Sequence, residues 1–558
     1  MGADPNQYAQ AQRRRQKRVD MIIGSPSDRK IVVGGPGTGK TFLFKQLLEE
    51  KSNALTLTFV NSLVEDLSLE LLGLSEVRTL HGFARSVLTK AVANDVKIFP
   101  KLSKVIRQDA EILLRDNVDF DSIFNMRADE PEPIEFYRRR RIYYEHYGFS
   151  DVVYGAVRYF EENPDAIPKY SQIVVDEFQD FNALEVALID LLASCSPVLL
   201  AGDDDQALYG NLKSASAGYI RERHSDTESE YESFTLPYCS RSTRVIVDAA
   251  NDIVNRALEC QCLQGRIDKP FEYFPDQEKD QESIENPWII HAQVFSNQIP
   301  WFIQEQIRAI ADEVRHRFTV LLISPTRAQS RRVVHGLREK GFQNVNSPKS
   351  QRSDQPTLLE GLRLLVQDGK SNLGWRVVAR HLLSESKFPP LLEQTAELDE
   401  AAQFREIVPK SIRKEANRLI RALRAVRDDK VDENEEVVAS LLEAVGVNAV
   451  AVGAASIRGT VKPSKGPQAE HAIRKIPIAA TTIPGSKGLS ADYVFITHFD
   501  DRFFIKERAQ GQVTDEEVCS FLVAITRARR RVYLISTDKR ETPTLLTWID
   551  AARIDAME

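Results

Sequence analysis

The sequence predicts an α/β protein with two parallel-sheet cores, each interrupted by a mostly helical insertion. Near the start of the chain, short apolar runs alternate with helix-like stretches, which is the pattern of parallel strands joined by helical crossovers. A second set of apolar runs follows in the C-terminal half, and one long helical stretch interrupts each set. The chain has 558 residues, which is enough for several domains.

The first core is expected to begin with a strand at residues 31–33, a glycine-rich turn and a helix-like stretch at 41–51. A second strand is expected at 54–60. A polar, aromatic-rich helical segment then interrupts the pattern, which resumes with strands at 171–175 and 197–201. Both of these strands run into acidic turns, so we expect acidic side chains at the edge of this sheet.

The second core is expected to contain four strands, at 318–323, 476–481, 493–497 and 531–535. Three polar stretches are predicted to be loops or linkers, at 276–286, 346–357 and 462–468. The predicted boundaries are 1–84 and 169–237 for the first core, 85–168 for its insertion, 238–349 and 471–558 for the second core, and 350–470 for its insertion.

Composition excludes some classes of protein. No apolar run reaches the roughly 18 residues that cross a bilayer, and the N-terminus lacks the apolar stretch of a secretory signal, so we expect a cytoplasmic protein. The lone pair Cys260 and Cys262 does not predict a zinc site. The net charge of −7 gives no overall attraction to a polyanion, so the basic clusters at 13–18 and 138–141 would have to provide it locally.

A phosphate-binding loop is the strongest motif. Residues 34–41 read Gly-Gly-Pro-Gly-Thr-Gly-Lys-Thr between an apolar strand and a helix. The glycines let backbone N–H groups turn inward around phosphate oxygens at the positive end of the helix. Lys40 is expected to neutralise the β- and γ-phosphates and Thr41 to ligate Mg²⁺. The predicted cofactors are ATP and Mg²⁺, bound by Gly35, Gly37, Thr38, Gly39, Lys40 and Thr41.

Two adjacent acids complete this site. Asp176 and Glu177 follow the apolar strand at 171–175. A phosphate loop needs a carboxylate on a neighbouring strand to hold Mg²⁺ and a second group to orient the attacking water. We therefore expect Asp176 to bind the metal and Glu177 to position the water.

These acids belong to the pentapeptide Asp-Glu-Phe-Gln-Asp at 176–180, which with its surroundings resembles the UvrD/Rep-like branch of superfamily 1 helicases. Other stretches are similar to motifs of that family in the same order: Thr-Phe-Val-Asn-Ser at 58–62, Thr-Leu-His-Gly-Phe at 79–83, Gly-Asp-Asp-Asp-Gln-Ala-Leu-Tyr-Gly at 202–210, Ser-Arg-Ser at 240–242, Ser-Lys-Gly-Leu at 486–489 and Val-Ala-Ile-Thr-Arg-Ala-Arg at 523–529. The resemblance implies two RecA-like motor domains that face each other across ATP.

The resemblance also implies roles for individual residues. Arg241 and Arg527 would reach the phosphates from the second core, and Gln179 and Gln206 would sense the γ-phosphate. The nucleotide would also contact Gln16, Tyr238 and Gly488. Nucleic-acid contacts would come from Phe59, Asn61, His81, Phe83 and Tyr209, although packing in the core is the alternative for Phe59 and Phe83.

The sequence departs from the family pattern at several sites, including Pro484 and Ser490, which replace a histidine and a glutamate around the Ser-Lys-Gly-Leu motif. An aromatic residue usually follows the Tyr-Gly pair, as in Tyr-Gly-Trp-Arg, but Tyr209-Gly210 is followed by Asn211-Leu212-Lys213. Ser240 stands where the family has a tyrosine, so Tyr238 is the candidate to stack on adenine. The departure after Tyr-Gly removes a base-stacking platform, and the one at Ser240 weakens the expected contact with adenine.

The function implied by the resemblance is an ATP-dependent translocase and helicase on single-stranded and partly duplex DNA, moving 3′ to 5′. Two alternatives remain open. One is an RNA helicase of the same superfamily, because the expected motor contacts are largely to the backbone. The other is an ATPase subunit that loads or gates a partner, such as a nuclease, with little unwinding of its own.

Overall fold

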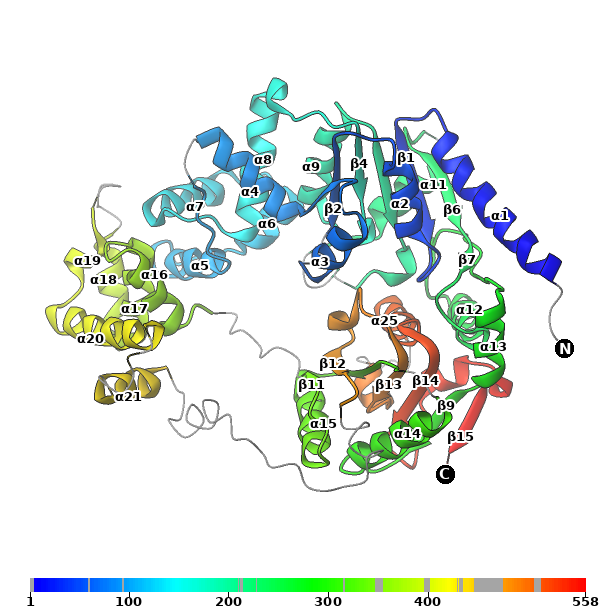
Figure 1. Ribbon diagram of the computed structural model, residues 1–558. Helices are drawn as coiled ribbons and strands as arrows, with labels where there is room; N and C mark the ends of the chain where they lie inside the picture. Colours follow the sequence, from blue (N-terminus) through cyan, green and yellow to red (C-terminus); the bar gives the residue numbers. More distant parts are fainter. Residues whose placement is uncertain are drawn as a thin grey trace.

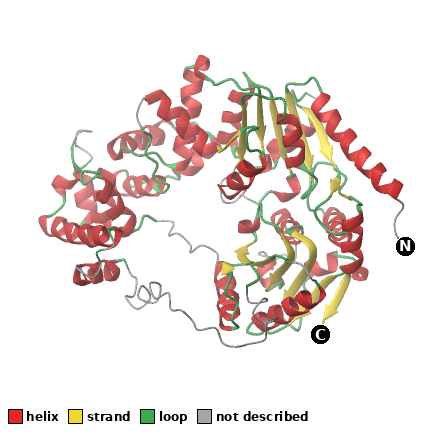
Figure 2. Ribbon diagram, viewed as in Figure 1, coloured by secondary structure: helices red, strands yellow, loops and turns green. Residues whose placement is uncertain are grey.

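Two α/β cores and two groups of helices make up the computed structural model (Figures 1 and 2). The structure describes residues 5–58, 61–92, 95–208, 210, 214–226, 228–314, 317–346, 355–395, 402–428, 430, 435–445, 475–505 and 513–557. One core contains a six-stranded sheet and the other a seven-stranded sheet, and all of the strand pairs in both sheets are parallel. The predicted fold class is therefore confirmed.

The first sheet has the strand order β3-β2-β4-β5-β1-β6. Its strands are β1 (Arg29–Gly34), β2 (Ala54–Thr58), β3 (Glu76–Thr79), β4 (Gln172–Val175), β5 (Val198–Gly202) and β6 (Glu232–Leu236). In register, Val33 lies opposite Gly202 and Val175 lies opposite Leu200. The turns after β1, β4 and β5 therefore meet at one carboxyl edge, although 140 or more residues of sequence separate the first from the others.

Helices α2 (Lys40–Leu48), α3 (Asn61–Glu70), α9 (Ala183–Ala193) and α11 (Gly218–Ser225) belong to this core. The N-terminal helix α1 (Pro5–Gly24) lies along its outer side in Figure 1. Val19 and Ile22 are buried in a cluster that also contains Leu43 and Phe44 of α2, so apolar packing fixes α1 beside α2.

The second sheet has the order β11-β12-β10-β13-β14-β9-β15. Its strands are β9 (Ile289–Gln293), β10 (Val320–Ser324), β11 (Val345–Asn346), β12 (Ile478–Thr482), β13 (Ala491–Thr497), β14 (Ala528–Ser536) and β15 (Ile554–Met557). Helices α12 (Arg244–Glu259), α13 (Gln277–Glu285), α14 (Ile299–Glu313), α15 (Arg327–Glu339), α24 (Asp501–Phe504) and α25 (Asp515–Ile525) accompany it. A two-stranded pair, β7 (Tyr238–Cys239) and β8 (Glu272–Tyr273), flanks α12 in sequence.

The structure corrects one predicted loop. Residues 276–286 were expected to be irregular, but α13 occupies most of this stretch. Asp276 caps the helix, since its carboxylate accepts a hydrogen bond from the backbone N–H of Lys279 at 2.8 Å. An aspartate directly before an otherwise charged helix is a start signal that polarity alone conceals. The predicted linker at 462–468 lies outside the described residues.

The first group of helices consists of α4 (Leu80–Val92), α5 (Leu102–Leu113), α6 (Phe120–Met126), α7 (Pro131–Tyr144) and α8 (Phe149–Glu162). The second consists of α16 (Leu358–Gln367), α17 (Asn372–Leu382), α18 (Phe388–Glu393), α19 (Phe404–Ile407), α20 (Lys410–Arg427) and α21 (Glu435–Ala444). The two groups of helices lie side by side in Figure 1. None of the helices in the described part of the chain is long and apolar enough to span a membrane.

A buried carboxylate joins the two helical insertions. Asp109 of α5 is fully buried and accepts hydrogen bonds from Arg140 of α7 at 2.9 Å and from Arg376 of α17 at 2.8 Å. The hydroxyl of Tyr144 donates to the same carboxylate at 2.6 Å. Burial on its own would raise the pKa of Asp109, but the charges of Arg140 and Arg376 lower it below the ordinary value.

Further contacts cross the same boundary. Lys101 forms an ion pair with Glu360 at 2.7 Å, and Asn372 donates to the backbone oxygen of Tyr143 at 3.1 Å. Apolar residues of both insertions belong to one continuous buried cluster, which also includes residues of the first sheet. The second insertion is therefore packed on the first core and its insertion, although its sequence lies within the second core.

Replacing Asp109 by asparagine should destabilise the protein strongly, because two buried arginines would lose their counter-ion. We expect the free energy of unfolding to fall by about 3–5 kcal/mol. Since the pKa of Asp109 is lowered in the folded state, this contribution is present above pH about 4 and is lost in more acidic solution. Urea denaturation at pH 7 and pH 3 measures both effects.

Glu135→Gln is the matched control, because Glu135 also pairs with two arginines but on the exposed face of α7. Its midpoint should equal that of the wild type. An Asp109→Asn midpoint close to that of the control would contradict the role given to the buried carboxylate.

Candidate functional site

The phosphate loop joins β1 to α2 and is held in shape by its own backbone. Gly37 and Gly39 have φ angles of +73° and +92°, which only glycine adopts without strain. The hydroxyl of Thr38 donates to the backbone oxygen of Gly35 at 2.8 Å, and the Lys40 ammonium donates to that of Gly34 at 2.8 Å. The loop is thus formed as the motif predicts, with its glycines, Lys40 and Thr41 at the start of α2.

The segment 240–243 lies directly on this loop. The backbone N–H of Ser240 donates to the oxygen of Gly37 at 3.1 Å. A Cβ atom added at Gly37 would overlap the Cβ of Arg241. The close approach explains why residue 37 must be glycine, and it places Arg241 against the phosphate loop.

The same segment is bonded to the second core. The Ser242 hydroxyl donates to the oxygen of Ala528 at 2.7 Å, and the N–H of Thr243 donates to that of Arg529 at 2.9 Å. Both acceptors follow Arg527 directly in the chain. Residues 240–243 therefore cross the cleft between the cores, and they bring Arg241 into the same region as Arg527.

Arg527 is buried where α25 leads into β14. Its guanidinium donates to Gln206 Oε1 at 2.5 Å and to the backbone oxygen of Val523 at 3.0 Å. Burial, and then the positive charge of Arg241, lower the pKa of Arg527 to about 10. Two guanidinium groups that repel each other in a partly desolvated cleft form a site that an anion would stabilise.

The predicted acids lie at the end of β4. Asp176 is buried, and its pKa is raised by burial and by the neighbouring charge of Glu177, whereas the charge of Lys40 lowers it. Burial also opposes ionisation of Glu177, but the charges of Lys487 and Lys40 outweigh it and lower the pKa of Glu177. Glu177 is therefore ionised at neutral pH.

A divalent metal fits this donor set. The Asp176 carboxylate and the Thr41 hydroxyl are oxygen ligands of the kind that Mg²⁺ prefers, and Mg²⁺ usually takes its remaining ligands from phosphates and water. A buried carboxylate whose pKa is raised would be returned to its ionised form by such a cation.

Gln179 links the acids to the next strand. Its amide donates to Glu177 Oε2 at 2.6 Å, and its Oε1 accepts the backbone N–H of Asp203 at 3.0 Å. Gly202 makes this link possible, because a Cβ atom there would overlap Gln179 Oε1. Gln179 therefore connects Glu177 to the turn that carries Gln206.

Lys487 is a member of this site that the sequence did not single out. Its side chain is 1% exposed, forms an ion pair with Asp180, and donates to the backbone oxygen of Gln206 at 2.9 Å. Glu177 Oε2 lies 3.5 Å from the same ammonium. The Ser-Lys-Gly-Leu motif contains Lys487 directly before Gly488, which has a φ of +83°.

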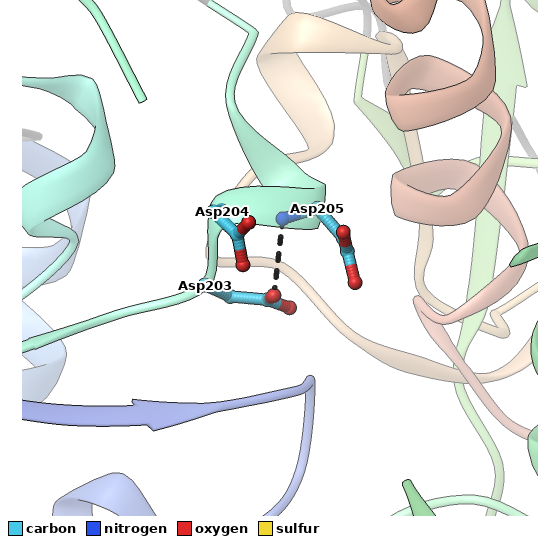
Figure 3. A group of neighbouring side chains, drawn as sticks. All are labelled: Asp203, Asp204 and Asp205. Atoms are coloured by element: carbon cyan, nitrogen blue, oxygen red, sulfur yellow. Dashed lines mark hydrogen bonds between the residues drawn. The ribbon is translucent and has the colours of Figure 1, made fainter. Parts of the chain in front are cut away.

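Three aspartates follow β5, and Figure 3 shows them at the turn of the chain. Asp203, Asp204 and Asp205 bring their carboxylate oxygens within 4.8 Å of one another. The ammonium of Lys269 already binds all three, at 3.1, 2.5 and 2.8 Å. Arg266 adds an ion pair to Asp205 at 2.8 Å, so protein cations neutralise a cluster that could otherwise hold a metal ion.

Asp203 also positions Gln206, since the amide of Gln206 donates to Asp203 Oδ2 at 2.5 Å. Lys269 therefore acts on Arg527 through two intermediates, Asp203 and Gln206. Sequence reasoning missed Lys269 because it lies 65 residues beyond Asp204, in no motif. Only the fold brings Lys269 next to these aspartates.

A groove of about 470 Å³ opens between the first core and its insertion. His81, at the start of α4, and Phe149, at the start of α8, both line it, with ring centroids 5.5 Å apart in an edge-to-face arrangement. Phe149 is 48% exposed and was not predicted, because it lies in the helical insertion and outside the motifs. An exposed aromatic ring beside a histidine can stack on a nucleic-acid base.

The other predicted nucleic-acid contacts fare differently. Phe83 is 3% exposed and packs in the core, so the alternative that the sequence left open is correct and the expected strand contact is wrong. Two other predicted contacts, Phe59 and Tyr209, lie outside the described residues. Asn61 begins α3, and its side chain is not described.

Gln16 lies in α1 and Tyr238 lies in β7. The Gln16 amide donates to Gln46 of α2 at 3.1 Å and to Asp20 at 2.8 Å. The ring centroid of Tyr238 lies 6.2 Å from that of Phe274. Contacts of these two side chains with adenine stay predictions.

Comparison with known proteins gives two matches to family models. Residues 19–211 match the AAA domain, and residues 378–539 match the UvrD-like helicase C-terminal domain. The first match contains the phosphate loop and the acids, and the second contains Lys487 and Arg527.

Individual relatives are similar over parts of the chain. The ATP-dependent DNA helicase PcrA of Staphylococcus aureus is 25% identical over 282 residues, which cover 41% of this chain and 38% of that protein. The putative ATP-dependent DNA helicase YjcD of Bacillus subtilis is 26% identical over 163 residues, 27% of this chain and 21% of the relative. One subunit of the ATP-dependent helicase/nuclease of Lactococcus lactis is 28% identical over 150 residues, 26% of this chain and 12% of the relative. The matched stretches thus span less than two fifths of each relative.

Replacing Gly37 by alanine should weaken nucleotide binding by at least about 10-fold, because the new Cβ pushes Arg241 and the loop apart. Gly73→Ala is the matched control. Gly73 has a similar φ of +80°, but a Cβ atom there meets nothing within 4 Å. Isothermal titration with ATP and thermal unfolding separate the two effects.

Both variants should lose about 1–2 kcal/mol of stability through backbone strain. Only Gly37→Ala should lose nucleotide affinity. Equal affinities in the two variants would contradict the packing of Arg241 on the phosphate loop.

Proposed function

We propose that this chain, which belongs to the UvrD/Rep-like superfamily 1 helicases, is an ATP-hydrolysing motor that acts on DNA. The observation that carries the proposal is the arrangement across the cleft. Lys40 and Glu177 come from the first core. Arg241 is held to the second core by the contacts of residues 242–243, and Arg527 of the second core donates across the cleft to Gln206 of the first. Cations from both sides surround one phosphate-binding loop.

Hydrolysis follows from the roles of these residues. The backbone N–H groups of residues 35–41 and the Lys40 ammonium bind the phosphates. Asp176 and Thr41 would hold Mg²⁺, which would supply positive charge to stabilise the phosphates. Glu177, ionised at neutral pH, orients the attacking water. Arg241 and Arg527 stabilise the negative charge that develops on the transferred group.

Movement follows from the contacts that cross the cleft. Lys487 of the second core is bonded to Asp180 and to the oxygen of Gln206, both in the first core. A γ-phosphate that attracts Arg527 competes with Gln206 for the same guanidinium, so binding and hydrolysis change how the two cores contact each other. If each core also grips a strand, alternating grips convert closure into directional steps.

Single-stranded DNA, with an adjoining duplex, is the proposed track. The groove with His81 and Phe149 supports strand binding, and the PcrA and YjcD relatives are described as DNA helicases. Movement from 3′ to 5′ rests on the family resemblance alone. A cytoplasmic location, as expected from the sequence, is part of the same proposal.

A second candidate is an ATPase subunit that loads or gates a nuclease. One relative is described as part of a helicase/nuclease, and the aromatic residue that usually follows Tyr-Gly is replaced here by asparagine at 211. A chain that binds the strand weakly would depend on a partner protein for strand binding. The complete set of hydrolytic residues fits either candidate.

The function is tested by ATPase assays of the purified chain with no polymer, single-stranded DNA, duplex DNA or RNA, followed by unwinding of substrates with a 3′ or a 5′ tail. We expect single-stranded DNA to stimulate most and the 3′-tailed substrate to be unwound. Greater stimulation by RNA would indicate an RNA helicase. Hydrolysis without strand separation, restored by a co-purifying protein, would indicate the second candidate. Absence of ATP hydrolysis under every condition would contradict the proposal.

Replacing Arg527 by alanine should lower kcat for ATP by about 10³–10⁵-fold and leave KM nearly unchanged, because the guanidinium acts mainly in the transition state. Steady-state kinetics with saturating single-stranded DNA measure both constants. Arg540→Ala, an exposed arginine beyond β14, is the control and should keep wild-type kcat. A pure effect on KM would contradict the role of Arg527.

Replacing Phe149 by alanine should weaken binding of single-stranded DNA by about 1–3 kcal/mol, which is the worth of one stacked base. Phe149→Trp should retain binding. Leu72→Ala, which changes an apolar side chain that is 80% exposed on the first core, is the control and should bind as the wild type does. Fluorescence anisotropy of a labelled oligonucleotide at several salt concentrations measures the affinity. Unchanged affinity of Phe149→Ala would show that Phe149 does not contact the DNA.

A further inference from the structure

One arginine outside the family motifs lies at the phosphate loop. Arg15 extends from α1 toward the start of α2, and its Nη2 lies 2.7 Å from the position that a Cβ atom at Gly39 would take. The guanidinium carbon is 5.0 Å from the ring centroid of Phe42 and 5.3 Å from that of Phe274. Arg15 therefore sits directly beside the residue that precedes the phosphate-binding lysine.

The two aromatic rings hold Arg15 without using its hydrogen-bond donors. A guanidinium stacks on rings through its flat faces, and its five N–H groups point outward in its plane. Within the described part of the chain, Arg15 makes no hydrogen bond and no ion pair. The donors of this side chain are therefore available to water or to a bound group.

A partly buried guanidinium without a neighbouring anion is unfavourable in free energy. Arg15 is partly buried, and burial lowers its pKa, but a guanidinium keeps its charge at neutral pH. A charge taken partly out of water is normally paired. Most other partly buried arginines here follow that rule, such as Arg266 with Asp205 and Arg223 with Asp190.

The position of Arg15 is fixed by its own helix. Val19 and Ile22 anchor α1 in the core, and the Gln16 amide is bonded to Gln46 of α2. The neighbouring Arg14 is exposed, so Arg15 alone among the basic residues 13–18 is turned toward the loop with aromatic rings around it. The helical periodicity therefore turns Arg15 inward, while the other basic residues of this stretch face solvent.

We propose that Arg15 binds a phosphate of the nucleotide and is a third arginine of the site, supplied by the N-terminal helix of the first core. The proposal rests on the proposed function, since it names a further contact of the same nucleotide. Arg241 and Arg527 come from the second core, whereas Arg15 stays with the loop whatever the distance between the cores. Arg15 therefore contributes to nucleotide binding when the cleft is open, and Arg241 and Arg527 contribute when it closes.

Equilibrium binding without DNA tests this role. Isothermal titration gives the Kd of Mg-ATP, Mg-ADP and tripolyphosphate for the wild type, Arg15→Ala, Arg15→Lys and Arg14→Ala. Arg15→Ala should weaken all three ligands by about 10- to 100-fold, the usual worth of hydrogen bonds to a charged group. Arg15→Lys should recover part of the loss, because it keeps the charge without the planar fork. Arg14→Ala should match the wild type.

Three outcomes would overturn the proposal. Tighter binding by Arg15→Ala would mean that the guanidinium blocks the site. Loss of ATP affinity with unchanged tripolyphosphate affinity would mean that Arg15 contacts the base. Equal affinities of Arg15→Ala and Arg14→Ala would mean that Arg15 only packs α1. A thermal unfolding midpoint equal to that of the wild type shows that Arg15→Ala is folded. If Arg15→Ala is not folded, the affinity of Arg15→Lys tests the proposal instead.

The binding measurement also separates this proposal from the proposed function. A wild-type chain that binds ATP but does not respond to DNA would contradict the motor and leave the role of Arg15 open to the same titration. A wild-type chain that binds no nucleotide would contradict both.

Discussion

The cleft between the two cores is spanned by residues 240–243, and the geometry of the candidate site depends on their hydrogen bonds to both sides. Ser240 is bonded to the phosphate loop, while Ser242 and Thr243 are bonded to the backbone that follows Arg527. Because an arginine stabilises phosphate charge only at hydrogen-bond distance, a change in the separation of the cores alters the contribution of both Arg241 and Arg527. The same short segment thus links the shape of the cleft to the chemistry within it.

Buried charges along this cleft are compensated by lysines that come from outside the phosphate-binding motif. Lys487 neutralises Asp180 and lowers the pKa of Glu177, and Lys269 neutralises the three aspartates after β5. Breaking such a pair leaves an uncompensated charge, which is far more costly than losing a surface pair. The contacts of Lys487 bridge the two cores, so opening of the cleft requires water or a ligand to replace them.

The helical insertions set which parts of the protein move together. The second insertion belongs to the second core in sequence, but Arg376 and Glu360 tie it to Asp109 and Lys101 of the first insertion. One buried apolar cluster extends from the first sheet through both insertions. In this structure the second insertion is therefore packed against the first insertion and the first core.

The sequence by itself determined the two parallel-sheet cores, the phosphate loop and the acids after β4, because each depends on a short local pattern: apolar runs of strand length, glycines where φ is positive, and carboxylates at a strand end. It missed edge strands such as β3 and β6, whose polar and partly exposed residues lack an apolar run, and it took α13 for a loop. Only the tertiary structure brought Lys269, Lys487 and Arg15 to the site and buried Phe83 in the core. Their roles depend on which side chains meet across large separations in sequence, and no local pattern records that distance.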